Sequence, residues 1–529
     1  MGKQPTSGYV AFVSRVLFIE NHDSFSWNVI DALPFARAEL EIVHAPDARL
    51  DGVDFVVMGP GPTDPQRAGL VELVREVARR RLPFLGVCLG HQALGLAFGA
   101  TLRRSPPAHG KRALAHYASG PVEVMRYHSL SLTDVAPPLR VTARLDDGTV
   151  MAIEHESLPM TGVQFHPDSF GTPSGRALLA KLCGRAPRAE PETVRQPRLA
   201  RPVQPTPIAL SSLTTDHALL APAFSGTEHW TLIDGLAPSP TGALWFADAE
   251  SKTPRRFTGR VRAVTPTFDV APTAPSVVLD ERGFLEGVAH IRQRIAAGDV
   301  YQVNLTCRAA LENVTGAGLL AHLCRRGVPR FAAWVKSTHL GEFVSASPEL
   351  LVETDGDWIH AEPMKGTAPP ADRQWLLDSE KDRAELAMIT DLLRDDLHHL
   401  CEPGSVRVTN ERRLIELPYV LQAVADVEGT LKKSLEEVLS VVHPGGSVTG
   451  APREAAIEVI EALEPTARGA YCGTLGLELE GAARFALLIR TAQRLESGWS
   501  YGVGSGITWD SDPQAELEEV RLKLGALSR

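Results

Sequence analysis

The sequence predicts an α/β domain with a doubly wound, mostly parallel sheet, followed by a larger α+β domain. Three observations predict this arrangement. The length of 529 residues suits about two to four domains of roughly 150 residues each. The first third of the chain alternates short apolar runs with helical patterns, whereas the remainder mixes amphipathic helices with strands. Between them, residues 186–207 are rich in Pro and Arg and poor in apolar side chains, which is typical of a linker.

The predicted first domain, residues 13–185, contains four strand-like apolar runs. These are Val16 to Glu20, Asp54 to Met58, Phe84 to Val87 and Gly162 to Phe165. Strands that alternate with helices form parallel sheets covered on both faces. Each run leads into polar or glycine-rich residues, and in such sheets ligand sites form at the carboxyl ends of the strands. We therefore expect the chemistry of this domain at those strand ends.

The predicted second domain, residues 208–529, mixes both kinds of element. Ser379 to Leu400 and Glu454 to Leu463 have amphipathic helical patterns, while Phe343 to Ala346 and Ala483 to Ala492 are strand-like. This mixture indicates an α+β domain, and periodicity alone names no topology for it.

Composition argues against several classes of function. The formal net charge is −10, from 64 acidic and 54 basic residues, whereas nucleic-acid-binding proteins usually carry a basic surplus. No apolar run approaches the ~18 residues of a membrane span, and we expect no signal peptide. The six cysteines include no CxxC pair, which argues against a zinc site or a disulfide framework. We expect a cytoplasmic protein that binds neither nucleic acid nor a membrane.

A cysteine nucleophile is predicted in the first domain. Cys88 lies just beyond a buried strand and ahead of a helical pattern, so the turn exposes its thiol beside helix N-terminal amides. His166 follows a second strand, and Asp168 comes two residues later. A Cys–His pair oriented by a carboxylate is the arrangement that activates a nucleophile for acyl transfer.

Five segments of this domain resemble the class I glutamine amidotransferases and occur in the same order. The resemblance is strongest to the amidotransferase subunits of anthranilate and aminodeoxychorismate synthases. The segments are Asn21 to Phe25, Gly59 to Pro62, Gly86 to Gln92, Tyr127 to Ser129 and Gly162 to Ser169.

The resemblance implies a role for each matching residue. Cys88 would form the glutamyl thioester, His166 would act as base, and Asp168 would orient His166. Glutamine and its oxyanion would be held by Gly59, Gly61, Leu89, Gln92, Ser129 and Leu130. Asp168 stands where the family usually has the longer Glu, so an inert glutaminase domain remains an alternative.

Two pairs of carboxylates in the second domain have the spacing of one helix face. Asp382 and Glu385 are three residues apart, as are Glu516 and Glu519, and Lys523 continues the second face. Carboxylates from two helices can converge as hard oxygen ligands for Mg²⁺, which also takes substrate oxygens and water. Taken alone, each pair is more often a solvated face.

The surrounding segments resemble the chorismate-utilising enzymes, in particular the synthase components of anthranilate and aminodeoxychorismate synthases. The resemblance covers roughly residues 275–527. It is carried by Gly298 to Leu305, Ser347 to Glu349, Pro363 to Thr367, Met388 to Leu392, His443 to Pro452, Tyr471 to Gly473 and Gly502 to Asp512.

This resemblance implies a metal site and a substrate site. Glu385 and Glu519 would ligate Mg²⁺ bound to a carboxylate of chorismate, with Asp382 and Glu516 in support. The residues expected to bind chorismate are Gln302, Gly366, Thr367, Thr449, Tyr471, Arg490, Gly504, Ser505 and Gly506. An arginine suits this task because a guanidinium can grip a carboxylate at two points.

Lys365 distinguishes between the possible products. By resemblance, aminodeoxychorismate synthases carry lysine at this position, whereas anthranilate synthases usually carry alanine. A neutral lysine amine can attack C2 of chorismate while Glu349, as general acid, protonates the leaving C4 hydroxyl. Ammonia then adds at C4 and expels the lysine. Gln302 favours amination over hydration, because isochorismate-forming relatives carry a lysine base there.

Together the resemblances imply one chain that hydrolyses glutamine and uses the ammonia, with Mg²⁺, to convert chorismate to 4-amino-4-deoxychorismate. Making p-aminobenzoate from this product requires a separate lyase, and the sequence leaves open whether folate or a specialised product such as an antibiotic is served. The alternatives are a 2-aminating enzyme of the anthranilate or aminodeoxyisochorismate type and an ammonia-only synthase. Gln422, Ala425 and Arg453 stand where the family often has His, Ser and Lys, which puts fine substrate positioning in question.

Overall fold

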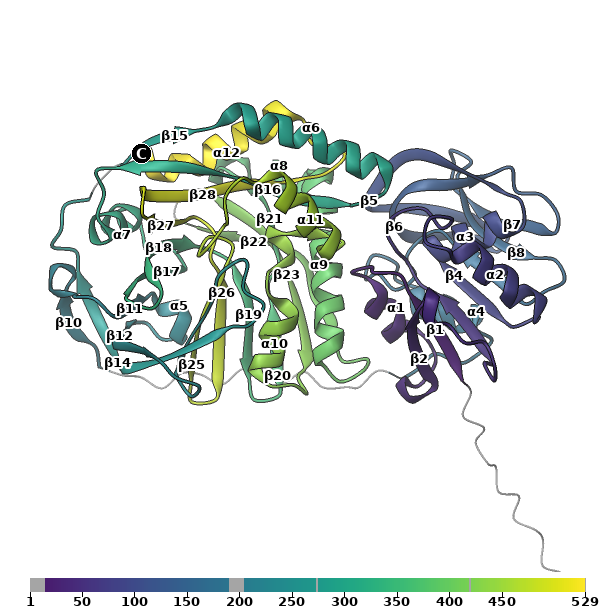
Figure 1. Cartoon of the computed structure of the whole chain (residues 1–529), viewed down its shortest axis with the longest axis horizontal. Coiled ribbons are helices and arrows are strands. Elements are labelled where there is room, and N and C mark those ends of the chain that lie inside the picture. The colour runs from purple at the N-terminus through teal and green to yellow at the C-terminus, as the bar shows by residue number, and fades with distance from the viewer. Residues whose placement is uncertain (1–14, 190–203, 273–274, 418–419, 529) are drawn as a thin grey trace, which may run out of the picture. The chain divides into compact units, whose positions relative to one another are not determined.

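The computed structural model of the chain describes residues 15–189, 204–272, 275–417 and 420–528 (Figure 1). The chain divides into two compact units. The first unit holds the chain through residue 188, apart from residues 106–111 and 127–129, which group with residues 189–529 in the second unit. The predicted linker lies largely outside the described residues, and the strand β10 (Thr206–Ala209) begins inside its predicted bounds.

A sheet covered by helices organises the N-terminal part of the chain. Its strands are β1 (Val16–Glu20), β2 (Leu40–His44), β3 (Phe55–Met58), β4 (Phe84–Val87), β5 (Thr101–Tyr117), β6 (Gly120–Thr133), β7 (Leu139–Arg144), β8 (Val150–His155) and β9 (Met160–Val163). Its helices are α1 (Ser26–Ala32), α2 (Leu70–Arg79), α3 (Leu89–Ala97) and α4 (Gly175–Leu182). Over the described residues the strand order is β2-β1-β3-β4-β9-β8-β7-β5-β6. The first five strands in this order run parallel, and β9, β8, β7 and β5 pair antiparallel.

Alternating side chains of β1 bury both faces of this sheet. Val16 and Phe18 pack in one apolar cluster with α1 and α4, whereas Leu17 and Ile19 pack in another with α2 and α3. A parallel strand that is covered on both faces is apolar throughout, as this one is. The doubly wound, parallel-rich sheet predicted from the sequence is thus confirmed.

One predicted strand differs in its bounds. The run Gly162 to Phe165 was expected to be a strand, but β9 begins at Met160 and ends at Val163. Its pairing with β4 ends where Val87 faces Val163, because the chain leaves β4 at the next residue. Gln164 and Phe165 therefore lie beyond the strand.

The second unit is built on mostly antiparallel strands, nineteen in the described residues. They are β10, β11 (His217–Leu220), β12 (Trp230–Pro238), β13 (Leu244–Ala247), β14 (Arg255–Thr267), β15 (Ser276–Leu279), β16 (Gln302–Glu312), β17 (Phe331–Ser337), β18 (Gly341–Ser347), β19 (Leu350–Asp355), β20 (Trp358–Ala361), β21 (Met364–Ala368), β22 (Arg407–Glu416), β23 (Leu421–Thr430), β24 (Gly450–Ala451), β25 (Thr474–Leu479), β26 (Ala482–Leu487), β27 (Thr491–Leu495) and β28 (Gly498–Ile507). Strand β10 pairs parallel with β14, unlike its neighbours.

Eight helices in the described residues pack on these strands. They are α5 (Pro222–Ser225), α6 (Glu281–Ala297), α7 (Gly316–Cys324), α8 (Arg373–Asp378), α9 (Glu380–Leu400), α10 (Leu435–Val442), α11 (Arg453–Leu463) and α12 (Pro513–Ser528). Helix α9 begins where the Ser379 hydroxyl accepts a hydrogen bond from the amide of Asp382, at 3.2 Å. Such an N-cap satisfies an amide that has no partner within the helix. The helices predicted at Ser379 to Leu400 and Glu454 to Leu463 are confirmed within one residue at their starts.

The predicted strand Ala483 to Ala492 is wrong as a single element. It is divided into β26 and β27, and Arg490 between them has a left-handed backbone with φ 51°. An apolar run does not encode such a turn, since the turn depends on the strands that each half pairs with. Strand β26 pairs with β25, and β27 pairs with β28.

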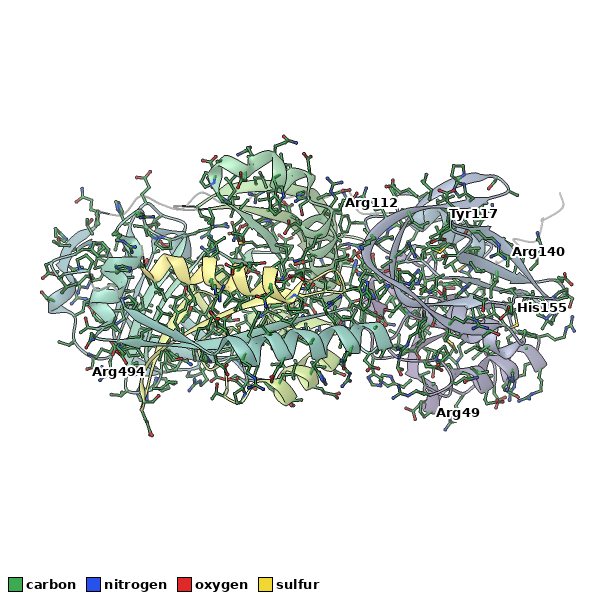
Figure 2. All side chains as sticks on the ribbon, turned by 90° about the horizontal axis from the view of Figure 1, so that it is seen from above. Arg49, Arg112, Tyr117, Arg140, His155 and Arg494 are labelled. Atoms are coloured by element: carbon green, nitrogen blue, oxygen red, sulfur yellow. The ribbon has the colours of Figure 1, made fainter. Side chains whose placement is uncertain are left out.

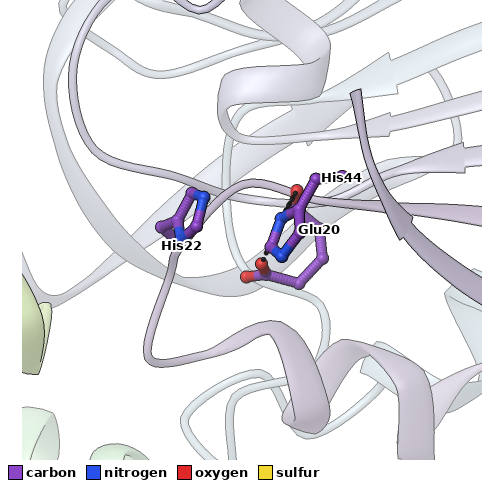
Figure 3. A group of neighbouring side chains, drawn as sticks. All are labelled: Glu20, His22 and His44. Carbon is purple, nitrogen blue, oxygen red and sulfur yellow. Dashed lines mark hydrogen bonds and ion pairs between the residues drawn. The ribbon is translucent and has the colours of Figure 1, made fainter. Parts of the chain in front are cut away.

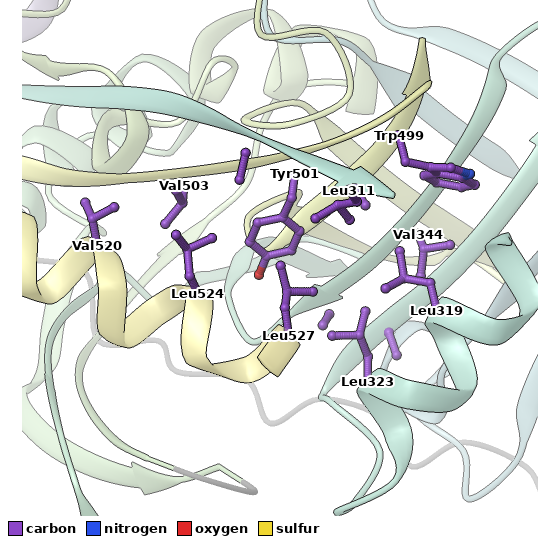
Figure 4. Close-up of a cluster of buried hydrophobic side chains, with 14 of the residues drawn as sticks. Leu311, Leu319, Leu323, Val344, Trp499, Tyr501, Val503, Val520, Leu524 and Leu527 are labelled. Atoms are coloured by element: carbon purple, nitrogen blue, oxygen red, sulfur yellow. The ribbon is translucent and has the colours of Figure 1, made fainter. Parts of the chain in front are cut away.

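A large apolar cluster supports one end of the second unit (Figure 4). Leu311 of β16 and Val503 of β28 contribute to it, together with Val520 and Leu524 of α12 and Leu319 of α7. Strands β16 and β28 pair antiparallel, which sets Thr306 opposite Gly504. Because close-packed interiors hold their side chains rigidly, this cluster fixes the glycine-rich end of β28.

Some charged side chains project from the surface. Arg140 and Arg494 are more than half exposed and project away from the ribbon (Figure 2). Among the helices that the structure describes, none is long and apolar enough to cross a membrane.

Candidate active sites

Cys88 occupies the turn between β4 and α3. Its backbone has φ 52° and ψ −100°, and its amide donates to the carbonyl of Val163 at 2.8 Å. A non-glycine residue keeps such a strained conformation only where the surrounding structure holds it. Gly86 must be glycine because a Cβ there would lie 2.4 Å from the carbonyl of Gly90. The structure thus places Cys88 at the strand-to-helix elbow that its sequence context predicts, but the expected exposure of the thiol is wrong, because the surrounding segments bury the residue.

His166 and Asp168 follow β9 and lie buried in the first unit. Nδ1 of His166 is 3.4 Å from Oδ1 of Asp168. Burial lowers the pKa of His166, but the Asp168 carboxylate and the Cys88 thiol outweigh burial and raise that pKa well above its ordinary value. The His166 amide donates to the carbonyl of Met125 at 2.9 Å, and the Thr172 hydroxyl donates to the His166 carbonyl at 2.7 Å. The shorter acid Asp168 therefore reaches the ring of His166.

Asn21 holds the loop that contains Gly59 and Gly61. Its side-chain amide donates to the carbonyls of Gly59, at 3.0 Å, and Pro60, at 3.3 Å. A Cβ on Gly61 would lie 2.7 Å from both the Asn21 Cβ and the Leu89 Cδ2, so the loop packs directly on the first residue of α3. Asn21 lies in a segment that matches the family, but its role was not predictable from local sequence because its partners are 38 and 39 residues away.

Gln92 connects α3 to two neighbouring segments. Its amide donates to the carbonyl of Leu130, at 3.2 Å, and to the side-chain oxygen of Gln164, at 3.3 Å. The amide of Gln164 lies 3.6 Å from Sγ of Cys88. Gln164 was not among the predicted site residues, although it lies in a matched segment. Ser129 precedes Leu130 on β6 and is buried.

Most of the predicted chorismate-binding residues surround one cavity in the second unit. The cavity has about 820 Å³ of empty volume, counting its open mouth. Its lining includes the predicted residues Glu349, Lys365, Gly366, Thr367, Asp382, Glu385, Tyr471, Arg490, Gly504, Gly506 and Glu519. Asn304, Lys381 and Ser447 also line it and were not predicted.

Lys365 projects from β21 toward Gly506 and Gln302. A Cβ on Gly506 would lie 2.4 Å from the Lys365 Nζ and 2.5 Å from the Gln302 Nε2, so only glycine leaves room for both side chains. Gln302 is fully buried, and neither end of its amide has a hydrogen-bond partner among the described residues. Leaving a buried amide unpaired is costly, which is the state expected of a group that pairs with substrate.

Glu349 is a buried carboxyl with a single close polar partner described, the Ser447 hydroxyl. That hydroxyl donates to Oε1 of Glu349 at 2.6 Å. Burial raises the pKa of Glu349 to about 7, although the Ser447 hydrogen bond and the charge of Lys365 oppose the rise. A carboxyl with this pKa is partly protonated at neutral pH and can serve as a general acid.

Arg490 and Tyr471 form another part of the cavity wall. The Tyr471 ring packs on Gly502, where a Cβ would lie 2.1 Å from ring carbons. Burial raises the pKa of Tyr471 well above its ordinary value, so its hydroxyl stays protonated. Thr449 and Ser505 are buried but do not line the cavity, and the Thr449 hydroxyl donates to the carbonyl of Gly445 at 3.0 Å.

Two lysines accompany the carboxylates of α9 and α12. The Lys381 Nζ lies 2.5 Å from Oε1 of Glu516 and 3.7 Å from Oε1 of Glu385. The Lys523 Nζ lies 2.8 Å from Oε1 of Glu519. Burial raises the pKa of Glu385 to about 7, although the charges of Lys365 and Lys381 oppose the rise. Helix spacing predicted that these acids share helix faces, but not that Lys381 lies between two of them.

The donor set suits a hard divalent cation. All four predicted ligands are carboxylates, and Oε2 of the buried Glu516 has no hydrogen-bond partner among the described residues. In the described chain, however, no three of these acids bring their ligand atoms within 4.8 Å of one another. A cation held by three of these acids would therefore require their side chains to rotate toward one another.

Gln422 and Arg453 retain polar contacts despite their departure from the family pattern. The amide of Gln422 donates to the Thr367 hydroxyl at 2.8 Å, within the cavity wall. Arg453 pairs with Asp396 and donates to the carbonyl of Val441 at 2.6 Å. Ala425 is fully buried, and its methyl side chain offers no polar group.

Comparison with known families matches both units. Residues 17–184 match the family model for glutamine amidotransferase class-I. Residues 244–529, more than half of the chain, match the model for chorismate binding enzyme. These two matches together cover all of the predicted residues of the two sites.

Two relatives show how these units occur elsewhere. The chain is 30% identical to an aminodeoxychorismate synthase of Streptomyces griseus, over 97% of this chain and 95% of the relative. It is 41% identical to anthranilate synthase component 2 of Mycobacterium tuberculosis, over 32% of this chain and 83% of that protein. The first match spans both units in one chain, whereas the second covers only the amidotransferase part.

A solved structure shows the fold of the second unit. A crystal structure described as a putative 2,3-dihydroxybenzoate-specific isochorismate synthase, DhbC from Bacillus anthracis, superposes with a TM-score of 0.52 at 21% identity. The match covers 60% of this chain and 97% of that structure. At this identity the likeness concerns the fold alone.

Proposed function

Because the chain belongs to the family of fused aminodeoxychorismate synthases, we propose that it converts chorismate to 4-amino-4-deoxychorismate with ammonia from glutamine. Each half of the reaction is assigned to one unit. Cys88, His166 and Asp168 release ammonia, and the cavity around Lys365 consumes it.

At the first site, the Cys88 sulfur attacks the side-chain amide carbon of glutamine. The carboxylate of Asp168 and the neighbouring Cys88 raise the pKa of His166, so its imidazole is a strong enough base to take the thiol proton as the sulfur attacks. The carbon–nitrogen bond then breaks, and His166 gives its proton to the departing ammonia. Water attacks the thioester, with His166 as base, to release glutamate. Gly59, Gly61, Leu89, Gln92, Ser129 and Leu130 would hold the substrate and its oxyanion.

At the second site, the Lys365 amine forms a bond to C2 of chorismate. Both ring double bonds shift, and the C4 hydroxyl leaves as water with a proton from Glu349. Ammonia forms the new C4–N bond, both double bonds shift back, and the Lys365 amine leaves C2. The proton that the added ammonia loses returns to the Glu349 carboxylate. The final product carries nitrogen at C4 and regenerates the free lysine.

The substrate's carboxylates would be held by residues of the cavity wall. Arg490, Tyr471 and the backbone of Gly504 and Gly506 would bind one of them, with Gln302, Gly366 and Thr367 around the ring. Glu385 and Glu519, supported by Asp382 and Glu516, would hold Mg²⁺. When bound, that ion supplies positive charge against a substrate carboxylate.

The observation that carries the choice of product is Lys365 itself. Its amine shares a glycine-lined space with Gln302 and lies in the same cavity as the acid Glu349. A lysine there supplies the nucleophile that 4-amination requires, whereas 2-amination needs only ammonia at C2.

Incubating the full chain with chorismate, glutamine and Mg²⁺, then identifying the product by chromatography and mass spectrometry, tests the proposal. We expect 4-amino-4-deoxychorismate, which an added aminodeoxychorismate lyase converts to p-aminobenzoate. Anthranilate or 2-amino-2-deoxyisochorismate would contradict the assignment. Turnover with ammonium but not with glutamine would instead support an inert first unit.

The wider setting of the reaction is part of the proposal. A separate lyase would consume the product, and the p-aminobenzoate would serve folate or a specialised product such as an antibiotic. The absence of CxxC pairs from the sequence supports a reducing, cytoplasmic setting. The acidic net charge argues against a nucleic-acid partner.

A further inference from the structure

Glu20, His22 and His44 form a cluster in the first unit that takes no part in the proposed reaction (Figure 3). Glu20 ends β1, His44 ends β2, and His22 lies in the turn after β1. One potential ligand atom from each residue lies within 4.8 Å of the other two. Among the described residues, no other group of three His, Cys, Asp or Glu side chains meets this condition.

The Glu20 carboxylate is held in a defined orientation. Its Oε1 accepts hydrogen bonds from the Asp23 amide and the Ser26 hydroxyl, both at 3.1 Å. Its Oε2 points to Nδ1 of His44, at 3.2 Å. The side chain of Glu20 is only 16% exposed. One carboxylate oxygen is thus fixed by the protein, while the other is presented to the imidazoles.

The two histidines lie face to face beside this carboxylate. Their ring centroids are 4.3 Å apart and the rings are nearly parallel, at 5°. His22 has a left-handed backbone with φ 58°, a conformation that few non-glycine residues adopt. Imidazole nitrogens are ligands for first-row transition metals. Both rings are partly exposed, so a small rotation can turn their nitrogens toward a common point.

We propose that Glu20, His22 and His44 form a binding site for a Zn²⁺-type transition metal ion, with the remaining coordination position filled by water. Two imidazoles and one carboxylate are a donor set that zinc accepts. Such an ion joins the ends of β1 and β2 across the turn that contains Asn21. The site is separate from the carboxylates of the second unit, whose all-oxygen donors suit Mg²⁺ instead.

Calorimetric titration of the metal-free full chain with Zn²⁺, in excess Mg²⁺, tests the proposal. The Cys88→Ser background removes the thiol that would otherwise compete for zinc. We expect one site that weakens by at least about tenfold in His44→Ala and in Glu20→Gln, because each loses a ligand. Glu20→Gln keeps an oxygen that can accept the bonds from Ser26 and the Asp23 amide. His22→Asn is a further test, since Asn tolerates the left-handed backbone.

The matched control is His116→Ala. His116 is also a half-exposed histidine of the first unit, with Nε2 2.9 Å from a carboxylate oxygen of Asp146. We expect it to leave Zn²⁺ affinity unchanged. Replacing Zn²⁺ by Co²⁺ gives a second measurement, a visible absorption band that His44→Ala removes.

Three results would overturn the proposal. These are no Zn²⁺ binding to the Cys88→Ser chain, equal binding in the three ligand variants, or an equal loss in His116→Ala. In each case the cluster is only a Glu–His ion pair beside a ring stack. Circular dichroism of every variant excludes a loss that comes from unfolding.

Discussion

Lys365 is the residue on which the proposed product depends. Replacing it by alanine removes the amine that attacks C2, so we expect 4-amination to fall at least about 100-fold, the scale of losing a group that acts on reacting atoms. Some 2-amination can then occur, because ammonia can attack C2 when no lysine amine is bonded to it. Product analysis by mass spectrometry, with chorismate and ammonium as substrates, measures both. Unchanged 4-amination in Lys365→Ala would exclude Lys365 as nucleophile.

Ser447 is a positioning residue for Glu349. Its hydrogen bond stabilises the ionised carboxylate, so Ser447→Ala should raise the pKa of Glu349 further. Because protonated Glu349 is the active form, the fall in rate with rising pH, centred near 7, should move to higher pH. At pH values below this fall, the maximal rate should be lower than that of the wild type, because the carboxyl loses the hydrogen bond that orients it.

The pH profile of ammonium-dependent amination, corrected for the fraction of neutral ammonia, measures this shift. Ser440→Ala is the control, since its hydroxyl is exposed and donates only within α10, to the Glu437 carbonyl at 2.8 Å. Ser447→Thr keeps the hydroxyl and should restore the wild-type limb. If the rate of Ser447→Ala falls over the same pH range as that of the wild type, Glu349 is not the acid whose titration limits the rate.

At the scale of elements, the glycine-rich end of β28 determines how closely side chains approach. Gly506→Ala places a Cβ 2.4 Å from the Lys365 Nζ and 2.5 Å from the Gln302 Nε2. Both side chains must shift, and a displacement of about 1 Å can cost about 100-fold in rate. We expect amination to fall on this scale while the chain stays folded.

Gly525→Ala is the control for this variant. Gly525 lies in α12, and a Cβ there meets no atom within 4 Å. Alanine is favoured over glycine inside a helix by about 0.5–1 kcal/mol, so this change should leave activity intact. Equal losses in both variants would argue against a steric effect at Lys365.

His360 joins three strands of the second unit. Its ring nitrogens lie 3.0 Å from Glu353 of β19 and 3.0 Å from Asp426 of β23. Burial lowers the pKa of His360, but the two carboxylates outweigh burial and raise it to about 9. A folded-state pKa above the unfolded value near 6.5 stabilises the fold fully below about pH 6.5, and this contribution is lost as pH rises through about 9.

We therefore expect the second unit to lose about 3 kcal/mol of unfolding free energy between pH 6.5 and pH 10 through this residue. Denaturant titrations followed by tryptophan fluorescence can measure this, and Trp358, stacked on His360 at 5.4 Å, is a nearby reporter. The His360→Gln variant should have a lower free energy of unfolding at pH 6.5, and its free energy of unfolding should depend less on pH. If the free energy of unfolding changes equally with pH in both proteins, another group is responsible for the pH dependence.

At the scale of the whole molecule, the two activities should separate. Cys88→Ala removes the sulfur nucleophile, so glutamine-dependent amination should fall about 10⁴-fold or more. Amination with added ammonium, at a pH where neutral ammonia is present, should remain near the wild-type value because the second cavity is untouched. Parallel assays of glutamate and 4-amino-4-deoxychorismate measure both. Glutamine turnover that survives this change would remove Cys88 from the mechanism.

Local patterns predicted the framework of each site. The apolar runs at Val16 to Glu20 and Phe84 to Val87 coincide with β1 and β4, because strands buried on both faces leave an unbroken apolar record. The i, i+3 spacing of Asp382 and Glu385 predicted that both lie on one face of α9, because residues three apart are neighbours on a helix surface. No local pattern in the sequence predicted the left-handed turn at Arg490.

The sequence by itself determined the two-part organisation, the elbow at Cys88 and the identity of the groups that carry charge. Only the tertiary structure decided which of these groups meet. Ser447 contacts Glu349 across 98 positions of sequence, and Lys381 contacts Glu516 across 135. Glu20, His22 and His44 likewise converge only because β1 and β2 pair in parallel. Local spacing encodes helices and strands, whereas contacts between distant segments depend on how the completed elements pack.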